Sequence, residues 1–250
     1  MKSEYLPILT TFERLAESYG DCGGMEEVNR RLLAPLVREW EGRILDVGCG
    51  AGNLIEKYVD PSRREVFTVD FSWNMISEAG KRLGGYKGRG LYFVRGLAQA
   101  LPFRRDSFDA ALSVNTLHNM PSAGDVRQAV AEMARVVRPR GLLMVEFRNA
   151  EHPERRRISE THDVAELPQK VFSLGDVRGF LEDAGFSVEQ AVPLSGERCG
   201  DGFFRGSLDR IMKKIMKESP EMTPRFAVLA RKGPGFRTVA IDGRGMPVTN

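Results

Sequence analysis

Short apolar runs alternate with helix-like segments along most of this chain. The apolar runs are five to seven residues long, the usual length of buried strands, and they lie at residues 43–47, 65–70, 91–95, 108–114, 142–147, 186–192 and 225–231. Segments with apolar residues at helical spacing lie between them, at residues 52–60, 73–83, 125–138 and 174–184. Strands that alternate with helices pair in parallel through right-handed crossovers. The pattern therefore predicts an α/β protein with a Rossmann-like, doubly wound sheet and helices on both faces.

The region before the first strand, residues 1–42, reads as helical. Residues 25–40 repeat apolar positions at helical spacing, and Pro35 among them predicts a kink or a break. We expect this helical lead-in to act as a cap that covers the functional site or one edge of the sheet.

Two segments near the C-terminus are less regular. Residues 195–223 form an insertion before the last strand, and within it residues 207–219 place apolar side chains on one helical face and lysines on the other. We expect an amphipathic helix packed on the body, with a lid or a dimer contact as the alternative. The tail, residues 232–250, is rich in glycine, and its residues 238–242 are a candidate edge strand. The predicted domain boundaries are thus 1–42, 43–231 and 232–250.

The composition of the 250 residues, 42% apolar and 28% charged, is typical of a globular protein with one sizeable core. The formal net charge of +3 neither implies nor excludes nucleic acid as a partner. The three cysteines, Cys22, Cys49 and Cys199, lie far apart, which argues against a metal site or a disulfide framework and favours a reducing compartment. No apolar run approaches membrane-spanning length, so we expect a cytoplasmic protein without a membrane span.

The most informative stretch is the strand and glycine turn at residues 44–54. Three glycines alternate in this turn, Gly48, Gly50 and Gly52, and Asp70 ends the next strand. Glycines let the backbone approach a ligand closely, and a carboxylate at the end of the second strand can hold a ribose diol. The arrangement predicts half of a nucleotide-binding site.

A carboxylate next to the turn restricts which nucleotide fits. NAD-type sites place a pyrophosphate at this turn, and Asp46, two residues before Gly48, would repel it. A ligand with an ammonium and a sulfonium group suits Asp46, and S-adenosylmethionine carries both. Cys49 and Asn53 lie in the same turn and complete the candidate cofactor contacts, with Cys49 as a small filler rather than a nucleophile.

The chain resembles the class I S-adenosylmethionine-dependent methyltransferases, particularly the methyltransferase type 11 group related to ubiquinone- and menaquinone-biosynthesis methyltransferases. The resemblance covers residues 43–148 and, more loosely, extends to residue 193. It rests on ordered motifs: the first at residues 45–54, the second at 69–79, the third and fourth within 96–119, and a helix-to-strand turn at 136–147. It implies a seven-stranded, mostly parallel sheet whose last strand runs antiparallel, and S-adenosylmethionine as the cofactor.

The resemblance also implies roles for individual residues. Asp70 would hold the ribose hydroxyls and Phe71 would lie on the adenine, with Met75 nearby. The family commonly has an acidic residue after the glycine of its third motif, and Leu97 stands at that position here. The side-chain oxygen of Gln99 could replace that acid, while the Ala98 backbone meets an adenine ring nitrogen. We expect Asn115 to line the methionine end of the cofactor site.

The acceptor should bind beyond the carboxyl ends of the strands at 108–114 and 142–147. His118, His152 and His162 follow these strands. His118 is the candidate general base, and a polar pocket wall is the alternative. Arg155, Arg156 and Arg157 could hold an anionic acceptor or form a solvated, charged helix face.

The leading functional hypothesis is a methyltransferase that acts on a small molecule, with homodimerisation open. The first alternative is an RNA methyltransferase, in which the basic runs would contact phosphates. An NAD-dependent oxidoreductase is disfavoured by the spacing of Asp46 and the glycines and by the missing Tyr-x-x-x-Lys pair. A cofactor-binding protein without catalysis also stays open.

Overall fold

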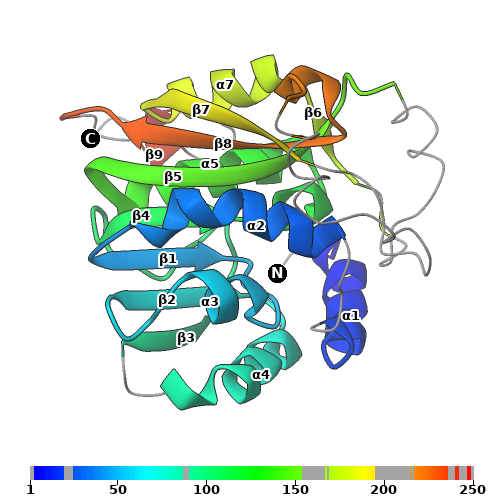
Figure 1. The fold of residues 1–250 in the computed structure, drawn as a ribbon, viewed down its shortest axis with the longest axis vertical. Coiled ribbons are helices and arrows are strands. Elements are labelled where there is room, and N and C mark those ends of the chain that lie inside the picture. The colour runs from blue at the N-terminus through cyan, green and yellow to red at the C-terminus, as the bar shows by residue number, and fades with distance from the viewer. Residues whose placement is uncertain are drawn as a thin grey trace.

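A computed structural model describes residues 3–19, 25–86, 90–153, 167, 169–194, 215, 217–235, 240–241 and 247–248. An eight-stranded sheet forms its centre (Figure 1). Seven strands form a continuous path, in the order β3 (Leu91–Arg95), β2 (Glu65–Asp70), β1 (Arg43–Val47), β4 (Phe108–Ser113), β5 (Val137–Asn149), β8 (Arg225–Lys232) and β7 (Phe186–Leu194). The eighth, β6 (Val171–Phe172), pairs with β5 at the side of this path.

The directions of the strands confirm the predicted sheet. β3, β2, β1, β4 and β5 run parallel to one another, whereas β8 is antiparallel to both β5 and β7. The last strand of the main sheet is therefore the antiparallel one, as expected. The two-residue strand β6 was not predicted, because two residues are too few to show any hydrophobic period.

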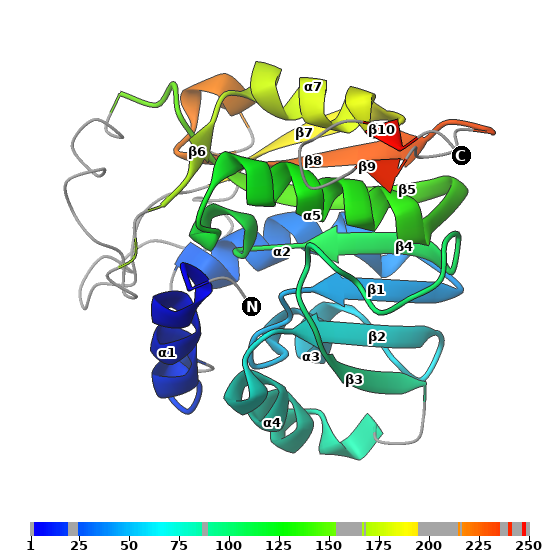
Figure 2. The same ribbon diagram turned by 180° about the vertical axis from the view of Figure 1, so that it is seen from behind.

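Helices cover both faces of the sheet. α5 (Ala123–Val136) and α7 (Leu174–Asp183) pack on one face (Figure 2), and α2 (Met25–Arg38) and α3 (Asn53–Tyr58) pack on the other (Figure 1). α4 (Trp73–Arg82) follows β2, and α1 (Tyr5–Leu15) lies beside α4 at the end of the sheet. The described residues also include three short 3₁₀ helices: η2 (Gly84–Tyr86), η3 (Leu117–Asn119) and η4 (Pro220–Met222).

The helical lead-in consists of α1 and α2. α2 continues through Pro35 to Arg38, so the predicted break does not occur there. Proline removes one intrahelical hydrogen bond. Leu33 and Val37, on either side of Pro35, are fully buried in the cluster between α2 and the sheet, and this packing offsets the loss.

The structure corrects the expectation that residues 238–242 add an edge strand to the main sheet. Ala240 and Ile241, from the candidate edge strand 238–242, form β9 (Ala240–Ile241), which pairs with β10 (Pro247–Val248) in a separate small sheet rather than with the main sheet. Most of the 195–223 insertion, including the lysine-bearing face at 213–214, lies outside the described residues. Ile215 is described, and it is buried in the same cluster as α2. Within the described part of the chain, no helix is long and apolar enough to cross a membrane. The cytoplasmic location stays a prediction.

Candidate functional site

The glycine turn after β1 is held against the end of β2. The backbone N–H groups of Gly48 and Cys49 both donate to the Val69 carbonyl, at 2.7 and 3.1 Å. Gly48 has φ +77°, and a Cβ atom there would stand 2.2 Å from the Thr116 side chain. Thr116 itself donates to the Gly48 carbonyl at 3.0 Å. The backbone angle at position 48 and the nearby Thr116 side chain therefore both require glycine there.

Asp70 connects the turn to the second strand. Its carboxylate accepts hydrogen bonds from the backbone N–H of Gly50, at 3.0 Å, and from the N–H of Ser72, at 2.9 Å. Ser72 in turn caps α4, because its hydroxyl accepts from Met75 N–H at 3.1 Å. Asp70 is thus not the helix cap itself. Each of its oxygens has a lone pair left for a ligand hydroxyl.

Asp46 is a buried carboxylate of a different kind. It is 3% exposed, and among the described residues it has no hydrogen-bond or ion-pair partner. Burial, together with the charge of Asp70, raises the pKa of Asp46 to about 7, and burial raises the pKa of Asp70 to about 6. A buried acid without a partner is costly to ionise, so this position is electrostatically prepared for a cation.

These groups open onto one cavity, and almost all of the predicted cofactor residues line it. The lining includes the following members of the predicted set: Asp46, Gly48, Cys49, Gly50, Asn53, Asp70, Phe71, Met75, Ala98, Gln99 and Asn115. The exception is Gly52, which precedes α3 with φ +80° and whose Cβ would stand 2.8 Å from a Leu83 methyl group. Its place is structural, because it lets the turn pack closely against Leu83.

The candidate base lies elsewhere. His118 is 1% exposed, its Nε2 atom is 3.5 Å from the Arg148 guanidinium, and it is not among the residues that line the cavity. Its neighbours Asn119 and Met120 line the cavity instead. His152 is partly exposed and does not line it either. His162 and the arginine run 155–157 lie outside the described residues.

Helix α1 supplies a wall that the motifs did not identify. Tyr5, Ile8 and Phe12 line the cavity, and their spacing places them on one face of the helix. The Phe12 ring meets the Phe71 ring edge to face, with centroids 6.2 Å apart. The expectation that residues 1–42 cover the site pointed to this wall. Because the helix lies far from the motifs in sequence, its individual contacts had no local signal.

A single carboxylate attaches α1 to the start of α4. Glu13 accepts from the backbone N–H groups of Trp73, at 2.7 Å, and Asn74, at 3.0 Å. The Asn74 side chain donates back to the Glu13 carbonyl at 3.0 Å. Negative charge at a helix N-terminus is favourable. Helix α1, which forms this wall, is therefore bonded to the residues that directly follow Asp70 and Phe71 in the sequence.

Tyr19 bridges the two halves of the cavity. Its hydroxyl accepts from the Asn115 side-chain amide at 3.1 Å, and its ring would lie 3.4 Å from a Cβ on Gly50. Asn115 has a left-handed backbone conformation, with φ +56°. Its N–H donates to the Glu146 carboxylate at 2.7 Å, and its side-chain oxygen accepts from Arg148 at 3.3 Å. Buried charged groups thus hold Asn115 in this orientation. Arg30 of α2 also lines the cavity, and sequence reasoning missed it.

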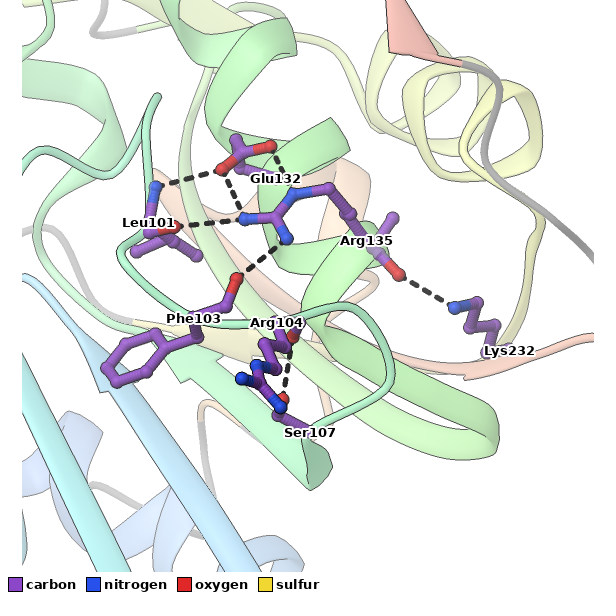
Figure 3. Close-up of polar contacts among 8 residues, drawn as sticks. Leu101, Phe103, Arg104, Ser107, Glu132, Arg135 and Lys232 are labelled. Atoms are coloured by element: carbon purple, nitrogen blue, oxygen red, sulfur yellow. Dashed lines mark hydrogen bonds and ion pairs between the residues drawn. The ribbon is translucent and has the colours of Figure 1, made fainter. Parts of the chain in front are cut away.

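The loop after β3, which carries Gly96–Gln99, is fastened to α5 (Figure 3). Glu132 accepts from Leu101 N–H at 2.9 Å, and Arg135 donates to the carbonyls of Leu101 and Phe103 at 3.0 and 2.8 Å. Glu132 and Arg135 also pair with each other at 2.6 Å. At the end of the same helix, the buried Lys232 ammonium donates to the Ala134 carbonyl at 2.8 Å. This part of the cavity wall is consequently preorganised.

Known proteins are similar to this chain in sequence. A family model described as a methyltransferase domain matches residues 45–145. The chain is 38% identical over 117 residues to a demethylmenaquinone methyltransferase of Renibacterium salmoninarum, a match that covers 46% of each chain. It is 30% identical over 161 residues to a ubiquinone/menaquinone biosynthesis C-methyltransferase of Bartonella henselae, which covers 61% of this chain and 60% of the relative. The chain thus spans about half of the length of these relatives.

A solved structure shares the fold. The magnesium protoporphyrin IX methyltransferase of Synechocystis, solved with bound SAH, superimposes with a TM-score of 0.65 at 15% identity, over 92% of this chain and 97% of that one. The matched segment 45–145 holds both acidic residues and the glycine turn of the cavity. Residues 45–145 of this chain are therefore similar in sequence to the family of methyltransferase domains.

Proposed function

We propose that this protein is an S-adenosylmethionine-dependent methyltransferase that acts on a small-molecule acceptor. The observation that carries the proposal is Asp46, a buried carboxylate without a partner among the described residues, at the cavity beside the glycine turn. A cationic cofactor would supply the missing partner, whereas the pyrophosphate of NAD would add a second negative charge. This argument disfavours the oxidoreductase alternative.

The residues of the cavity fit this cofactor end to end. Asp46 would face its amino group, Asp70 its ribose hydroxyls, and Phe71 its base. Gly48 and Gly50 line the cavity between these groups, where the backbone of the turn would approach the methionine part of the cofactor. When bound, S-adenosylmethionine supplies an electrophilic methyl group on a sulfonium sulfur. The protein's task is then to align the acceptor with that methyl group and to exclude water.

The lining indicates the kind of acceptor. The wall formed by Ile8, Phe12, Tyr19 and Met120 is apolar or aromatic, which suits a small molecule with a flat, apolar body. The two relatives described above act on quinone precursors according to their names, and we propose an acceptor of comparable chemistry. An anionic acceptor held at residues 155–157 and a homodimer stay predictions.

The test is methyl transfer from S-adenosylmethionine with a labelled methyl group. The full chain is incubated separately with reduced naphthoquinones and benzoquinones, with small anionic acceptors, and with RNA. The proposal expects label in the extracted small molecule, together with formation of S-adenosylhomocysteine. Label in RNA alone would support the RNA alternative, and the absence of any label despite cofactor binding would support a non-catalytic protein. The variant Asp46→Asn tests the proposed role of Asp46, because it should lose methyl transfer while it keeps the fold.

A further inference from the structure

Tyr19 crosses the cavity between the glycine turn and the end of β4. Its ring would lie 3.4 Å from a Cβ atom on Gly50, and its hydroxyl meets the Asn115 side chain at 3.1 Å. Asn115 follows β4, which β1 separates from β2 and its terminal Asp70. Because ligands of an open α/β sheet bind beyond the carboxyl ends of its strands, the Tyr19 hydroxyl lies on the side where the acceptor is expected.

The hydrogen bonds of Asn115 determine which way its amide faces. Arg148 can only donate, and its guanidinium contacts the Asn115 side-chain oxygen at 3.3 Å. The amide nitrogen must then face Tyr19, and it donates to the hydroxyl oxygen. An amide turned the other way would oppose its own N–H groups to the guanidinium. The Arg148 side chain, which is buried, therefore sets the orientation of Asn115.

This orientation makes Tyr19 a donor on its other side. The Asn115 amide nitrogen cannot accept a proton, so the hydroxyl proton of Tyr19 is directed away from it. The second N–H of Asn115 has no acceptor among the described residues. The hydrogen bonds from Arg148 through Asn115 to Tyr19 all run in one direction, and bonds in such a chain strengthen one another. Two neighbouring donors with a positive charge behind them thus line the cavity.

Other hydroxyl groups that line the cavity are oriented differently. The Thr116 hydroxyl donates to the Gly48 carbonyl at 3.0 Å, and the Tyr5 hydroxyl contacts the Asp125 side chain. Both of these groups face acceptors within the protein. Tyr19, by contrast, contacts a donor through its oxygen, which suits it to donate to a ligand.

We infer that Tyr19 and Asn115 together bind a negatively charged oxygen of the methyl acceptor, which is therefore an acidic phenol or enol that reacts as its anion. The inference rests on the proposed function and specifies its substrate class. Hydrogen bonds donated to an ionised oxygen favour the ionised form over the neutral one. Arg148 acts through Asn115 and is a positioning residue.

The reaction then needs no proton-accepting side chain next to the transferred methyl group. The acceptor loses its hydroxyl proton to water as it binds. An electron pair of the anion forms the new bond to the methyl carbon, and the electrons of the broken carbon–sulfur bond stay on the sulfur of S-adenosylhomocysteine. If the ring carbon beside the oxygen is the nucleophile, it afterwards loses its own proton to water. The position of His118, which does not line the cavity, agrees with this sequence of steps.

The test is the ionisation of a coloured phenol bound to the complex of the full chain with S-adenosylhomocysteine. The probes are para-nitrophenol and lawsone, a hydroxynaphthoquinone, whose absorption changes on ionisation, so a pH titration gives the pKa of the bound probe. The wild type should bind the anion about tenfold more tightly than the neutral form, which lowers that pKa by about one unit. Asp46, Asp70 and Arg30 also line the cavity, and they are the same in every variant compared.

Four variants and one control assign the effect to the proposed groups. Tyr19→Phe keeps the ring, removes the hydroxyl and should lose most of the shift. Asn115→Gly suits the left-handed φ of +56° and should lose it as well. Arg148→Met should reduce the shift, whereas Arg148→Lys retains a charged donor and should keep more of it. Tyr92→Phe, the control, removes an exposed hydroxyl on β3 outside the cavity and should behave as wild type.

The outcomes separate the inference from the proposed function. A wild type that binds S-adenosylhomocysteine but binds neither probe, or leaves the pKa of both unchanged, overturns the inference alone. A shift that persists in Tyr19→Phe overturns it too, and this variant decides alone if a melting curve shows that Asn115→Gly does not fold. A wild type that does not bind S-adenosylhomocysteine overturns the proposed function as well.

A second titration tests whether the pair holds the cofactor instead of the acceptor. Methylthioadenosine lacks the amino-acid end of S-adenosylhomocysteine. The inference expects Tyr19→Phe to change the affinities for these two ligands by the same factor. A loss of affinity confined to S-adenosylhomocysteine would assign Tyr19 to the carboxylate of the cofactor and overturn the inference.

Discussion

The backbone N–H of Gly50 donates a 3.0 Å hydrogen bond to the carboxylate of Asp70, 20 residues further along the chain. This bond joins the glycine turn after β1 to the end of β2. It places the turn, which approaches the ligand with its backbone, next to the carboxylate proposed to hold the ribose. Asp46 lies on the same side of the sheet, and the charge of Asp70 contributes to its raised pKa. The charge of Asp70 thus makes Asp46 harder to ionise.

Cofactor affinity should depend on pH because of Asp46. Its pKa is about 7 in the ligand-free protein, and a bound ammonium group would lower that pKa. Below pH 7 binding must then release a proton, so affinity for S-adenosylhomocysteine should rise as the pH increases from 5.5 to 8. Calorimetry in buffers with different ionisation enthalpies measures the proton released. Asp60→Asn, on an exposed loop, is the matched control. Affinity that is independent of pH, with no proton released, would contradict the role of Asp46.

The Asp46 carboxyl group should also make the ligand-free protein less stable at neutral pH than at acidic pH. The pKa of Asp46 is raised in the folded state, so between its ordinary value of 3.8 and about 7 the folded state binds more protons than the unfolded state. Stability then falls as the pH rises through this window. Asp46→Asn should therefore raise the free energy of unfolding at pH 8 by about 1 kcal/mol or more, since each pKa unit corresponds to about 1.4 kcal/mol. Urea unfolding at pH 5 and pH 8 measures this, and a variant less stable than wild type at pH 8 would refute it.

Gly48→Ala should destabilise the fold and prevent ligand binding. The new methyl group would stand 2.2 Å from the Thr116 side chain, at a residue with φ +77°. The clash and the left-handed backbone together should cost about 2–4 kcal/mol. Gly84→Ala is the control, because nothing lies within 4 Å of its Cβ position. Thermal unfolding of both variants measures the difference, and equal melting temperatures would show that the turn has room to adjust.

Glu13→Ala should loosen α1 from the site. The substitution removes the acceptor for the N–H groups of Trp73 and Asn74, so these two amides should exchange with solvent markedly faster. Affinity for S-adenosylhomocysteine should fall severalfold, because α1 provides Tyr5, Ile8 and Phe12 to the cavity. Hydrogen exchange followed by NMR measures the first effect. Glu17→Ala, an exposed position just after the same helix, should change neither quantity.

The sequence predicted those parts of the site that are local along the chain. The glycine turn, Asp46 and Asp70 lie in strand–turn–helix segments whose geometry follows from alternating glycines and apolar runs, and all but Gly52 of the predicted residues line the cavity. Their contacts with a cofactor stay predictions. Tyr19 and Arg30 could not be found in this way, since only the packing of α1 and α2 on the sheet brings them to the cavity.

His118 shows a different limit. Its position after β4 was predicted, yet within the single turn of η3 the side chain points to Arg148 while Asn119 and Met120 face the cavity. Hydrophobic patterns over three residues do not determine which way each side chain points. Pro35 shows that a local helix-breaking signal can yield to packing, because buried Leu33 and Val37 hold α2 together across it.

The most direct test of the central claim is a calorimetric titration of the full chain with S-adenosylmethionine, S-adenosylhomocysteine and NAD, repeated with Asp46→Asn and Asp70→Ala. We predict micromolar binding of the first two ligands by the wild type, at least tenfold weaker binding by each variant, and no binding of NAD. Binding of NAD, without binding of either of the other two, would contradict the proposal that Asp46 and the glycine turn form a methyl-donor site.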